Sequence, residues 1–500
     1  MTLLIRNVQI LGSDQKLPDR LDVFVSGEKI AAIGRFPGKK ADEIIEGAGC
    51  YLSPGFIDID TESDHYLSLF SHPSQDDFLK QGVTTIVGGL CGASLAPLIY
   101  GNLESIEDWT DTRQVNVDWH SVSEFLKVLE RRRLGVNFAT LVGHTTIRQA
   151  IIGGAPRDLT KNELKIFAKM LEQALRDGAF GFSTALSYVQ NRATPYSEIK
   201  FLASVVKEAD AVYATHLRND TYDLIQSVEE AVKIANETGA KTFISHLLPL
   251  QNFEKEYEQA LNRFEQLPET LDFHFSLYPS KIRILKLYTF LPSWAQKDDL
   301  KVMSMSLQDS WLRGKILKDM PKIDPKEFIV AQAPGNNSLV GYSLVDLKKL
   351  YSLKTYEETL LKLMETTNFQ GSIFYSNTNE YLIRRAIQSK RSFVASNAAS
   401  LPVDAKIKTL KPERATSTFT KFLSWVQDDK IMTIEDAVKK ITFEPARKLG
   451  LKNRGVVKAG YFADLTGFKG SEVLFTVVNG QVAVKNGEFS NVFNGQVLRH

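Results

Sequence analysis

A strand–helix–strand unit near the N-terminus constrains the fold of this chain more than any other stretch. It reads PGFIDIDTESDHYLSLF from Pro54 and then, after a helical segment, GVTTIVGGLCGASLAP up to Pro97. Phe56–Asp60 and Thr84–Gly88 are short runs rich in apolar and β-branched residues, and polar or glycine residues follow each of them. This pattern is typical of a buried strand that ends in a loop. The unit therefore predicts an α/β fold with parallel strands.

Strands and amphipathic helices alternate from residue 56 to about residue 451. Repeated βα units predict a parallel sheet. The sequence has nine candidate strands, whereas a (β/α)8 barrel has eight, so one candidate is extra or misassigned. A doubly wound sheet is the structural alternative, but polar residues at the ends of many strands favour the closed barrel. The candidates are Phe56–Asp60, Thr84–Gly88, Asn137–Val142, Phe180–Thr184, Val212–Thr215, Thr242–Ser245, Phe273–Leu277, Ser372–Tyr375 and Phe393–Ala395.

Both ends of the chain carry short β-patterned segments without the helices found between them. Residues 1–54 and 452–500 are each too few to bury a core alone, so we expect them to pack as one small β-domain. Residues 55–451 would form the barrel, with an insertion at about 285–345 where the βα rhythm breaks. The predicted fold class is α/β, a (β/α)8 TIM-type barrel with a small β-sandwich domain formed by both termini.

The composition excludes several kinds of protein. The 500 residues are 43% hydrophobic and 24% charged with a net charge of +2, which is ordinary for a globular protein. No basic tract indicates nucleic-acid binding, and no apolar run reaches the ~18 residues of a membrane span. The first residues lack the features of a signal peptide. With only two cysteines, Cys50 and Cys91, a disulfide framework is excluded and the cytoplasm is the expected location.

Three residues that follow predicted strands have side chains suited to zinc. They are Cys91 in GGLCGAS, His216 in YATHLR and His246 in FISHLL. Thiolate and imidazole are the donors that zinc prefers. Taken singly, each histidine is as well explained as a hydrogen-bonded core residue. Because the strand ends of a barrel converge at one mouth, the three together predict a metal site.

Acidic residues follow the first barrel strand, where Asp60 and Glu62 precede Asp64. These carboxylates would supply oxygen ligands or a general base at the same mouth. The alternative is a solvated acidic loop without a chemical role.

The chain resembles the N-acyl-D-amino-acid deacylases (D-aminoacylases) of the amidohydrolase superfamily. PGFID and GYFADL are typical of the superfamily, and the cysteine after the second strand together with THLR and ISH is typical of the deacylase branch. Further matching stretches run almost from end to end: IRNVQILG, VSGEKIAAIG, GHTTIR, LRDGAFGFSTALSY, LPSW, TIEDAVKKITFEPARKLGL, NRGVVKAG, VNGQVAVKNGEF and GQVLRH.

The resemblance implies a small-molecule substrate with a carboxylate and a tightly bound zinc ion. The zinc ligands of the family, one cysteine and two histidines, correspond to Cys91, His216 and His246. Arg414 in PERATSTF resembles the arginine that binds the substrate carboxylate, and Tyr278 in LYP resembles a tyrosine of the same pocket.

The sequence departs from the family at three places in the implied site. A His-x-His pair that holds a second metal is replaced by Asp60 and Glu62, so we expect one zinc ion rather than two. The catalytic aspartate is replaced by Asn397, whose amide cannot accept a proton from an attacking water. A lysine that helps to hold the substrate carboxylate is replaced by Leu248.

Two functions from different classes follow from this combination. In the first, the protein hydrolyses the C–N (amide) bond of a small N-acylated substrate, with Asp60 or Glu62 as the base or as a second-metal ligand. In the second, it is a catalytically impaired or inactive relative that acts as a binding or structural protein. The retained metal trio favours the first, and the loss of the aspartate, the His-x-His pair and the lysine favours the second.

Overall fold

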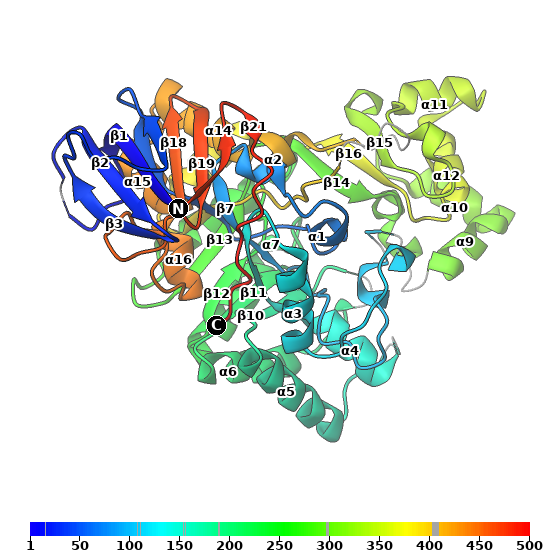
Figure 1. Ribbon diagram of the computed structural model, residues 1–500. Helices are drawn as coiled ribbons and strands as arrows, with labels where there is room; N and C mark the ends of the chain where they lie inside the picture. Colours follow the sequence, from blue (N-terminus) through cyan, green and yellow to red (C-terminus); the bar gives the residue numbers. More distant parts are fainter. Residues whose placement is uncertain are drawn as a thin grey trace.

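The computed structural model describes residues 1–15, 17–107, 109–110, 112–153, 155, 157–188, 191–296, 300–402 and 410–500. In Figure 1 the β-domain, coloured blue and red, lies beside a central barrel, and an α/β insertion in yellow-green extends from the opposite side of the barrel. Residues 297–299 of the predicted insertion lie outside the described residues.

Parallel strands form the wall of the barrel and confirm the predicted fold class. Neighbouring strands are hydrogen-bonded in parallel from β6 to β8 and from β9 to β17. The third place of the wall holds both β8 and β9. The strands are β6 (Phe56–Asp58), β7 (Val83–Gly88), β8 (Asn137–Thr140), β9 (Val142–Gly143), β10 (Gly181–Ala185), β11 (Val212–His216), β12 (Lys241–Ile244), β13 (Phe273–Leu277) and β17 (Ser392–Val394).

Backbone hydrogen bonds complete the wall at its two seams. At the first seam the N–H of Asn397 donates to the carbonyl of Asp60 at 2.7 Å, next to the ends of β17 and β6. At the second, the N–H of Phe180 donates to the carbonyl of Thr140 at 2.9 Å and links β10 to β8. These bonds bring the end of the last strand directly beside the end of the first, which is where the candidate site lies.

One strand candidate, Ser372–Tyr375, was wrongly placed in the barrel. It forms β16 (Ser372–Ser376), which pairs antiparallel with β14 (Ile282–Lys286) and β15 (Phe328–Gln332) in a separate sheet. This sheet has its own apolar core and helices, so the insertion extends from about 282 to 376 and is larger than predicted. Its helices are α9 (Leu300–Gln308), α10 (Ser310–Asp319), α11 (Leu344–Leu350) and α12 (Tyr356–Thr366).

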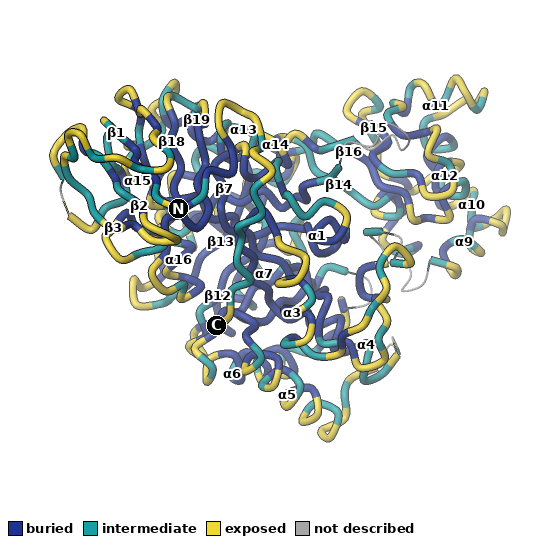
Figure 2. Tube along the Cα trace, in the orientation of Figure 1, coloured by how far each residue is buried: buried dark blue, intermediate teal, exposed yellow. Residues whose placement is uncertain are grey.

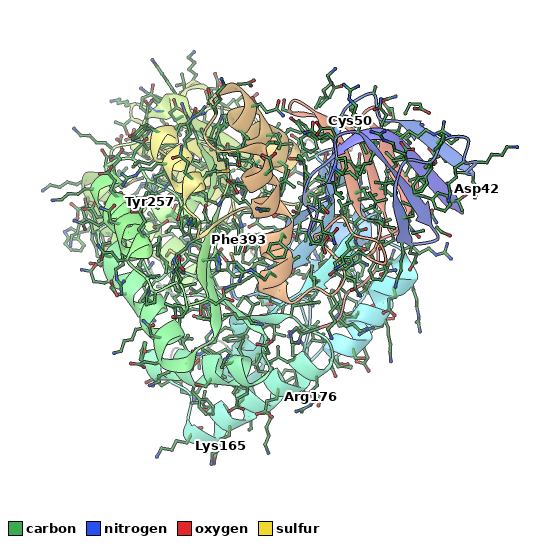
Figure 3. The ribbon with its side chains drawn as sticks, turned by 90° about the vertical axis from the view of Figure 1, so that its left-hand side faces the viewer. Asp42, Cys50, Lys165, Arg176, Tyr257 and Phe393 are labelled. Carbon is green, nitrogen blue, oxygen red and sulfur yellow. The ribbon has the colours of Figure 1, made fainter. Side chains whose placement is uncertain are left out.

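The strands at the two ends of the chain share one sheet. It joins them where β5 pairs antiparallel with β18, and apolar residues from both ends fill a common core that includes Cys50 (Figure 3). The last residues leave this sheet and run beside β8, where the N–H of Phe138 donates to the carbonyl of Gln496 at 2.9 Å. The strands are β1 (Thr2–Ile10), β2 (Leu21–Ser26), β3 (Lys29–Gly34), β4 (Glu43–Glu46), β5 (Tyr51–Pro54), β18 (Leu465–Lys469), β19 (Glu472–Val478), β20 (Gln481–Lys485) and β21 (Glu488–Phe489).

Amphipathic helices cover the outside of the barrel and bury its wall (Figure 2). Two of them begin with a capping box, Ser121 with Glu124 and Thr160 with Glu163, which satisfies the first backbone N–H groups. No helix in the described part of the chain is long and apolar enough to cross a membrane. The helices are α1 (Ser68–Ser71), α2 (Asp76–Leu79), α3 (Val122–Arg132), α4 (His144–Ile152), α5 (Lys161–Arg176), α6 (Tyr196–Glu208), α7 (Leu224–Thr238), α8 (Glu254–Glu265), α13 (Glu380–Gln388), α14 (Glu413–Asp428), α15 (Ile434–Ile441) and α16 (Phe443–Leu449).

Candidate metal centre

A thiol and two imidazoles meet at the mouth of the barrel. One ligand atom from each of Cys91, His216 and His246 lies within 4.8 Å of the other two. Sγ of Cys91 is 3.3 Å from Nε2 of His246, and the two imidazole rings are perpendicular with centroids 4.4 Å apart. Two ligands of one tetrahedral zinc ion, at about 2.0 and 2.3 Å from the metal, lie about 3.5 Å apart. The trio therefore has the spacing of ligands to one ion.

The backbone is strained where it presents these groups. Cys91, His246 and Asn397 have φ angles of 48°, 35° and 45°. Residues with a side chain avoid this left-handed region, and such conformations cluster at functional sites because the surrounding structure must hold them. Each of the three lies in a loop just after a barrel strand. The strained residues therefore lie at the same mouth of the barrel as the candidate metal ligands.

Serine hydroxyls hold the two loops that carry the ligands. Oγ of Ser183 donates to the carbonyl of Gly89 at 2.6 Å and accepts from the N–H of Gly92 at 3.1 Å, so it fixes both sides of Cys91. Oγ of Ser276 accepts from the N–H of His246 at 2.7 Å. These bonds explain how the loops keep their conformations.

The ionisation of the trio is set by burial. Burial raises the pKa of the Cys91 thiol well above its usual value, and the nearby carboxylates of Asp60 and Glu62 raise it further. Burial also lowers the pKa of His216 to about 4 and that of His246 well below its usual value. Both imidazoles are therefore neutral at pH 7, as metal ligands must be. Nδ1 of His216 is buried and has no hydrogen-bond partner among the described residues. A nitrogen in this state is suited to bind a metal ion.

The two predicted carboxylates lie beside the trio but are not part of it. Asp60 is fully buried, and its Oδ2 accepts from Oγ of Ser276 at 2.9 Å. Burial raises the pKa of Asp60 to about 6, and burial also raises the pKa of Glu62. Among the residues that the structure describes, the set of mutually close ligand atoms contains neither carboxylate. Asp64 is tied to the backbone of the loop that carries Cys91, because its Oδ2 accepts from the N–H of Gly89 at 2.6 Å.

The residues matched to substrate binding lie together beside Asn397. Nε of Arg414 donates to the carbonyl of Asn397 at 2.9 Å, and its guanidinium lies 4.9 Å from the centre of the Tyr278 ring. Nη1 of Arg414 is buried and has no hydrogen-bond partner in the described structure. An unsatisfied buried guanidinium nitrogen is costly, so its place indicates an anion or a carbonyl oxygen on a ligand. Leu248 is buried in the barrel core and adds no second cation.

Sequence reasoning missed three residues of this site. Ser276 links Asp60 to the His246 loop, and its only signal is a lone serine in an apolar strand. Tyr188 hydrogen-bonds to Cys91 and packs edge-on against His216 with centroids 5.4 Å apart, and its signal is an aromatic residue just after a strand. Trp109 hydrogen-bonds to Glu62 from a long loop whose sequence gives no sign of it.

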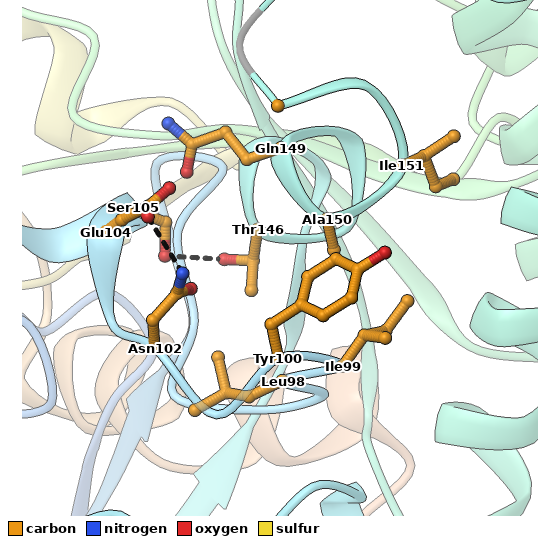
Figure 4. A pocket seen from close by; sticks show the side chains of 11 residues that line it. Leu98, Ile99, Tyr100, Asn102, Glu104, Ser105, Thr146, Gln149, Ala150 and Ile151 are labelled. Carbon is orange, nitrogen blue, oxygen red and sulfur yellow. Dashed lines mark hydrogen bonds between the residues drawn. The ribbon is translucent and has the colours of Figure 1, made fainter.

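A hollow of about 290 Å³ lies between α4 and the loop that follows β7 (Figure 4). Within it Asn102 donates to Glu104 at 2.8 Å, and Thr146 donates to Ser105 at 2.9 Å. None of the site residues predicted from the sequence lines it. The hollow is therefore distinct from the candidate metal centre.

Comparison with curated proteins finds relatives across most of the chain, although no family model matches it. The chain is 28% identical over 484 residues to an N-acyl-D-aspartate deacylase of Alcaligenes xylosoxydans xylosoxydans, a match that spans 95% of the chain and 87% of the relative. It is 27% identical over 460 residues to a D-aminoacylase and to an N-acyl-D-glutamate deacylase of the same organism. These matches cover 91% of the chain and 86% and 84% of the two relatives.

Solved structures share the whole fold. A D-aminoacylase, described as defining a subset of amidohydrolases, superposes with a TM-score of 0.81 at 24% identity, covering 100% of the chain and 99% of the other. An N-acyl-D-glutamate deacylase from Bordetella bronchiseptica, complexed with zinc and a phosphonate inhibitor, gives a TM-score of 0.80 at 24% identity with the same coverage. An L-hydantoinase from Arthrobacter aurescens is more distant, at 0.56 and 14%, over 100% of the chain and 99% of the hydantoinase.

Proposed function

We propose that this chain, which belongs to the D-aminoacylase family of the amidohydrolases, is a zinc-dependent hydrolase of the amide bond in small N-acylated amino acids. The observation that carries the proposal is the convergence of Cys91, His216 and His246 within 4.8 Å at the carboxyl ends of parallel strands. A thiolate and two imidazoles leave one position of a tetrahedral zinc site open, which is the arrangement of catalytic rather than structural zinc.

The fit of a zinc ion rests on the donor set and on the unpartnered Nδ1 of His216. When bound, zinc supplies Lewis-acid polarisation of a carbonyl group and acidifies water. One ion suffices for the proposal, because the carboxylates of Asp60 and Glu62 stand apart from the trio. A D-aminoacylase with a binuclear metal centre is described by one-metal activation and second-metal attenuation, which supports a one-metal site here.

The other residues would bind the substrate and move its proton. Arg414 offers its free Nη1 to the substrate carboxylate, beside the ring of Tyr278. Asp60 is the carboxylate placed to accept a proton, since Ser276 and Asn397 orient it and its pKa of about 6 lies close to neutrality. Asn397 cannot take this role, because an amide has no basic site at any physiological pH.

A second candidate function is a non-catalytic binding protein that keeps the metal. The observation that favours it is the engagement of both Asp60 oxygens, one with Ser276 and one with Asn397. A carboxylate that already accepts two hydrogen bonds is a weaker base toward a water molecule.

Amine release from N-acetyl amino acids distinguishes the two functions. Zinc-loaded protein is incubated with a panel of both configurations, and Cys91→Ala is measured in parallel. The hydrolase proposal expects slow but measurable release that depends on Cys91. Full zinc loading without any release from any member of the panel would favour the binding protein instead.

A further inference from the structure

We infer that Glu62 selects the side chain of the substrate, admitting small uncharged side chains and rejecting acidic ones. The inference rests on the proposed function, because it concerns which N-acylated amino acids the same site takes. It starts from a cavity between the barrel mouth and the sheet of the insertion, which is not the hollow of Figure 4. Glu62 lines this cavity, and it is near enough to Cys91 for its charge to raise the pKa of the thiol.

The cavity is small and mostly apolar. About 30 Å³ is free inside it, and Ile284 and Phe374 of the insertion sheet line it together with Ala398 and Ala399. Glu62 is the one charged residue among the described residues that line it, and none of these is lysine, arginine or histidine. A second carboxylate on a substrate would therefore meet Glu62 but no cation among the described residues that line the cavity. A small alkyl group would bury its surface there, and a neutral amide could donate its N–H to Glu62 without charge repulsion.

Glu62 is held in place rather than free to swing away. Its backbone N–H donates to the carbonyl of Ala398 at 2.9 Å, and the side chain of Trp109 hydrogen-bonds to its carboxylate. Oε2 of Glu62 lies 4.0 Å from Nη2 of Arg414, and the Glu62 residue is only 8% exposed. A fixed carboxylate in this buried place repels a second negative charge more strongly than one in water would.

The three arms of an N-acylated amino acid fit three features of this mouth. The acyl amide belongs at the metal trio, and the α-carboxylate belongs at the free Nη1 of Arg414. Glu62 stands near both, since it lies 4.0 Å from Arg414 and its charge acts on the thiol of Cys91. The side chain branches from the carbon that joins the other two arms, so the cavity beside Glu62 is the place left for it. The single positive charge of Arg414 can balance one substrate carboxylate. It cannot also balance a second one beside the carboxylate of Glu62.

The test compares two ligands of the same shape that differ in one charge. N-acetyl-D-asparagine and N-acetyl-D-aspartate are titrated into zinc-loaded protein by calorimetry, without any need for turnover. We expect the asparagine derivative to bind at least about tenfold more tightly, a difference of about 1.4 kcal/mol. In Glu62→Gln this preference should fall below about threefold. Glu444→Gln, which removes a half-buried glutamate paired with Arg447 at 2.6 Å on the outer helix α16, should leave the preference unchanged.

A second variant tests the location of the side chain independently of Glu62. Phe374→Ala enlarges the cavity from the insertion side, so it should improve the binding of N-acetyl-D-leucine relative to N-acetyl-D-alanine by at least about fivefold. Zinc content and thermal melting of each variant show that the site and the fold are intact.

Equal binding of the aspartate and asparagine derivatives by the unmodified chain would overturn the inference, as would a preference that survives in Glu62→Gln. Selective binding without cleavage would support the selectivity and contradict the proposed hydrolysis. Cleavage of both derivatives with equal efficiency would contradict the selectivity alone.

Discussion

The side-chain amide of Asn397 donates to Oδ1 of Asp60 across 3.4 Å, at the seam where the last barrel strand meets the first. The backbone N–H of Asn397 also donates to the carbonyl of Asp60 at 2.7 Å. An amide that donates here orients the carboxylate but cannot replace it as a base. In the proposed hydrolysis the proton acceptor is therefore Asp60, whereas the family resemblance implies an aspartate in the place of Asn397.

We predict that the unmodified chain hydrolyses N-acyl-D-amino acids poorly, with kcat/KM well below the ~10⁴ M⁻¹s⁻¹ usual for enzymes. Asn397→Asp alone should gain little, because the new carboxylate would lie about as close to Asp60 as the amide does now, and like charges this near cannot both ionise easily. Asn397→Asp combined with Asp60→His, Glu62→His and Leu248→Lys should gain more than the sum of the separate changes, since groups that act as one unit are non-additive.

The measurement is kcat/KM on N-acetyl-D-amino acids for the unmodified chain, each single variant and the combination. Zinc content serves as the control for an intact metal site. Efficient turnover by the unmodified chain would show that a base is already in place and that the site is not impaired.

Ser276→Ala should lower both metal affinity and activity by roughly 10–100-fold, the usual effect of removing a group that orients a metal ligand. The hydroxyl of Ser276 accepts from the N–H of His246 and donates to Asp60, so its loss frees the strained loop and leaves a buried carboxylate with one partner fewer. Zinc binding and kcat/KM are measured together.

Ser245→Ala is the matched control for this change. Ser245 is the neighbour of His246, and its buried hydroxyl has no hydrogen-bond partner in the part of the chain that the structure describes. It should behave like the unmodified chain. Equal losses in both variants would mean that Ser276 acts only through packing.

The metal trio could be predicted from sequence because each member directly follows an apolar strand. A parallel barrel brings all such positions to one mouth, whatever the details of packing. Ser276 carries no comparable signal, since a serine within an apolar strand is usually a satisfied core residue. Trp109 reaches Glu62 from a loop whose path depends on contacts distant in sequence.

The misplacement of Ser372–Tyr375 has a related cause. The segment has the β-branched and aromatic composition of a barrel strand, and composition does not reveal its pairing partners. Those partners, β14 and β15, begin about 90 and 45 residues earlier in the chain. Because this pairing is long-range, the extent of the insertion could not be predicted from the local sequence pattern.

The two cysteines give a direct test of the metal site. Cys91→Ala should lose nearly all bound zinc, because a tetrahedral site with two imidazoles alone binds weakly. Cys50→Ala should keep about one equivalent, since Cys50 lies in the core of the β-domain. Elemental analysis of protein purified without chelator measures both. Similar zinc content in the two variants would contradict the assignment of Cys91.

Lys440 should make the stability of the protein depend on pH. Burial lowers the pKa of Lys440 to about 7, and its Nζ donates to the carbonyls of Ser389 and Ser392 at 2.7 and 2.8 Å. In the unfolded chain a lysine titrates near 10.4. Between pH 7 and 10.4 the unfolded state thus binds more protons than the folded state, so stability rises with pH in this window.

The free energy of unfolding in urea, measured at several pH values from 6 to 10, checks this prediction. The difference between the unmodified chain and Lys440→Met should grow by up to about 1.4 kcal/mol per pH unit above pH 7. Lys439→Met, at the exposed neighbour of Lys440, should show no such trend. A pH-independent difference for Lys440→Met would mean that this lysine keeps an ordinary pKa.

Gly89→Ala should destabilise the fold by roughly 2–6 kcal/mol, because strain and overpacking act together. Gly89 has a φ of 73°, and an added Cβ would lie 2.1 Å from the carbonyl oxygen of Leu141. The backbone of the third barrel position would have to move, and the carbonyl that Ser183 holds beside Cys91 would move with it.

Gly450→Ala is the control, since its φ is 69° but an added Cβ would meet nothing within 4 Å. It should cost only about 1–2 kcal/mol, and zinc loss should accompany Gly89→Ala alone. Equal destabilisation of the two variants in urea would show that backbone conformation, and not the contact with Leu141, decides the role of Gly89.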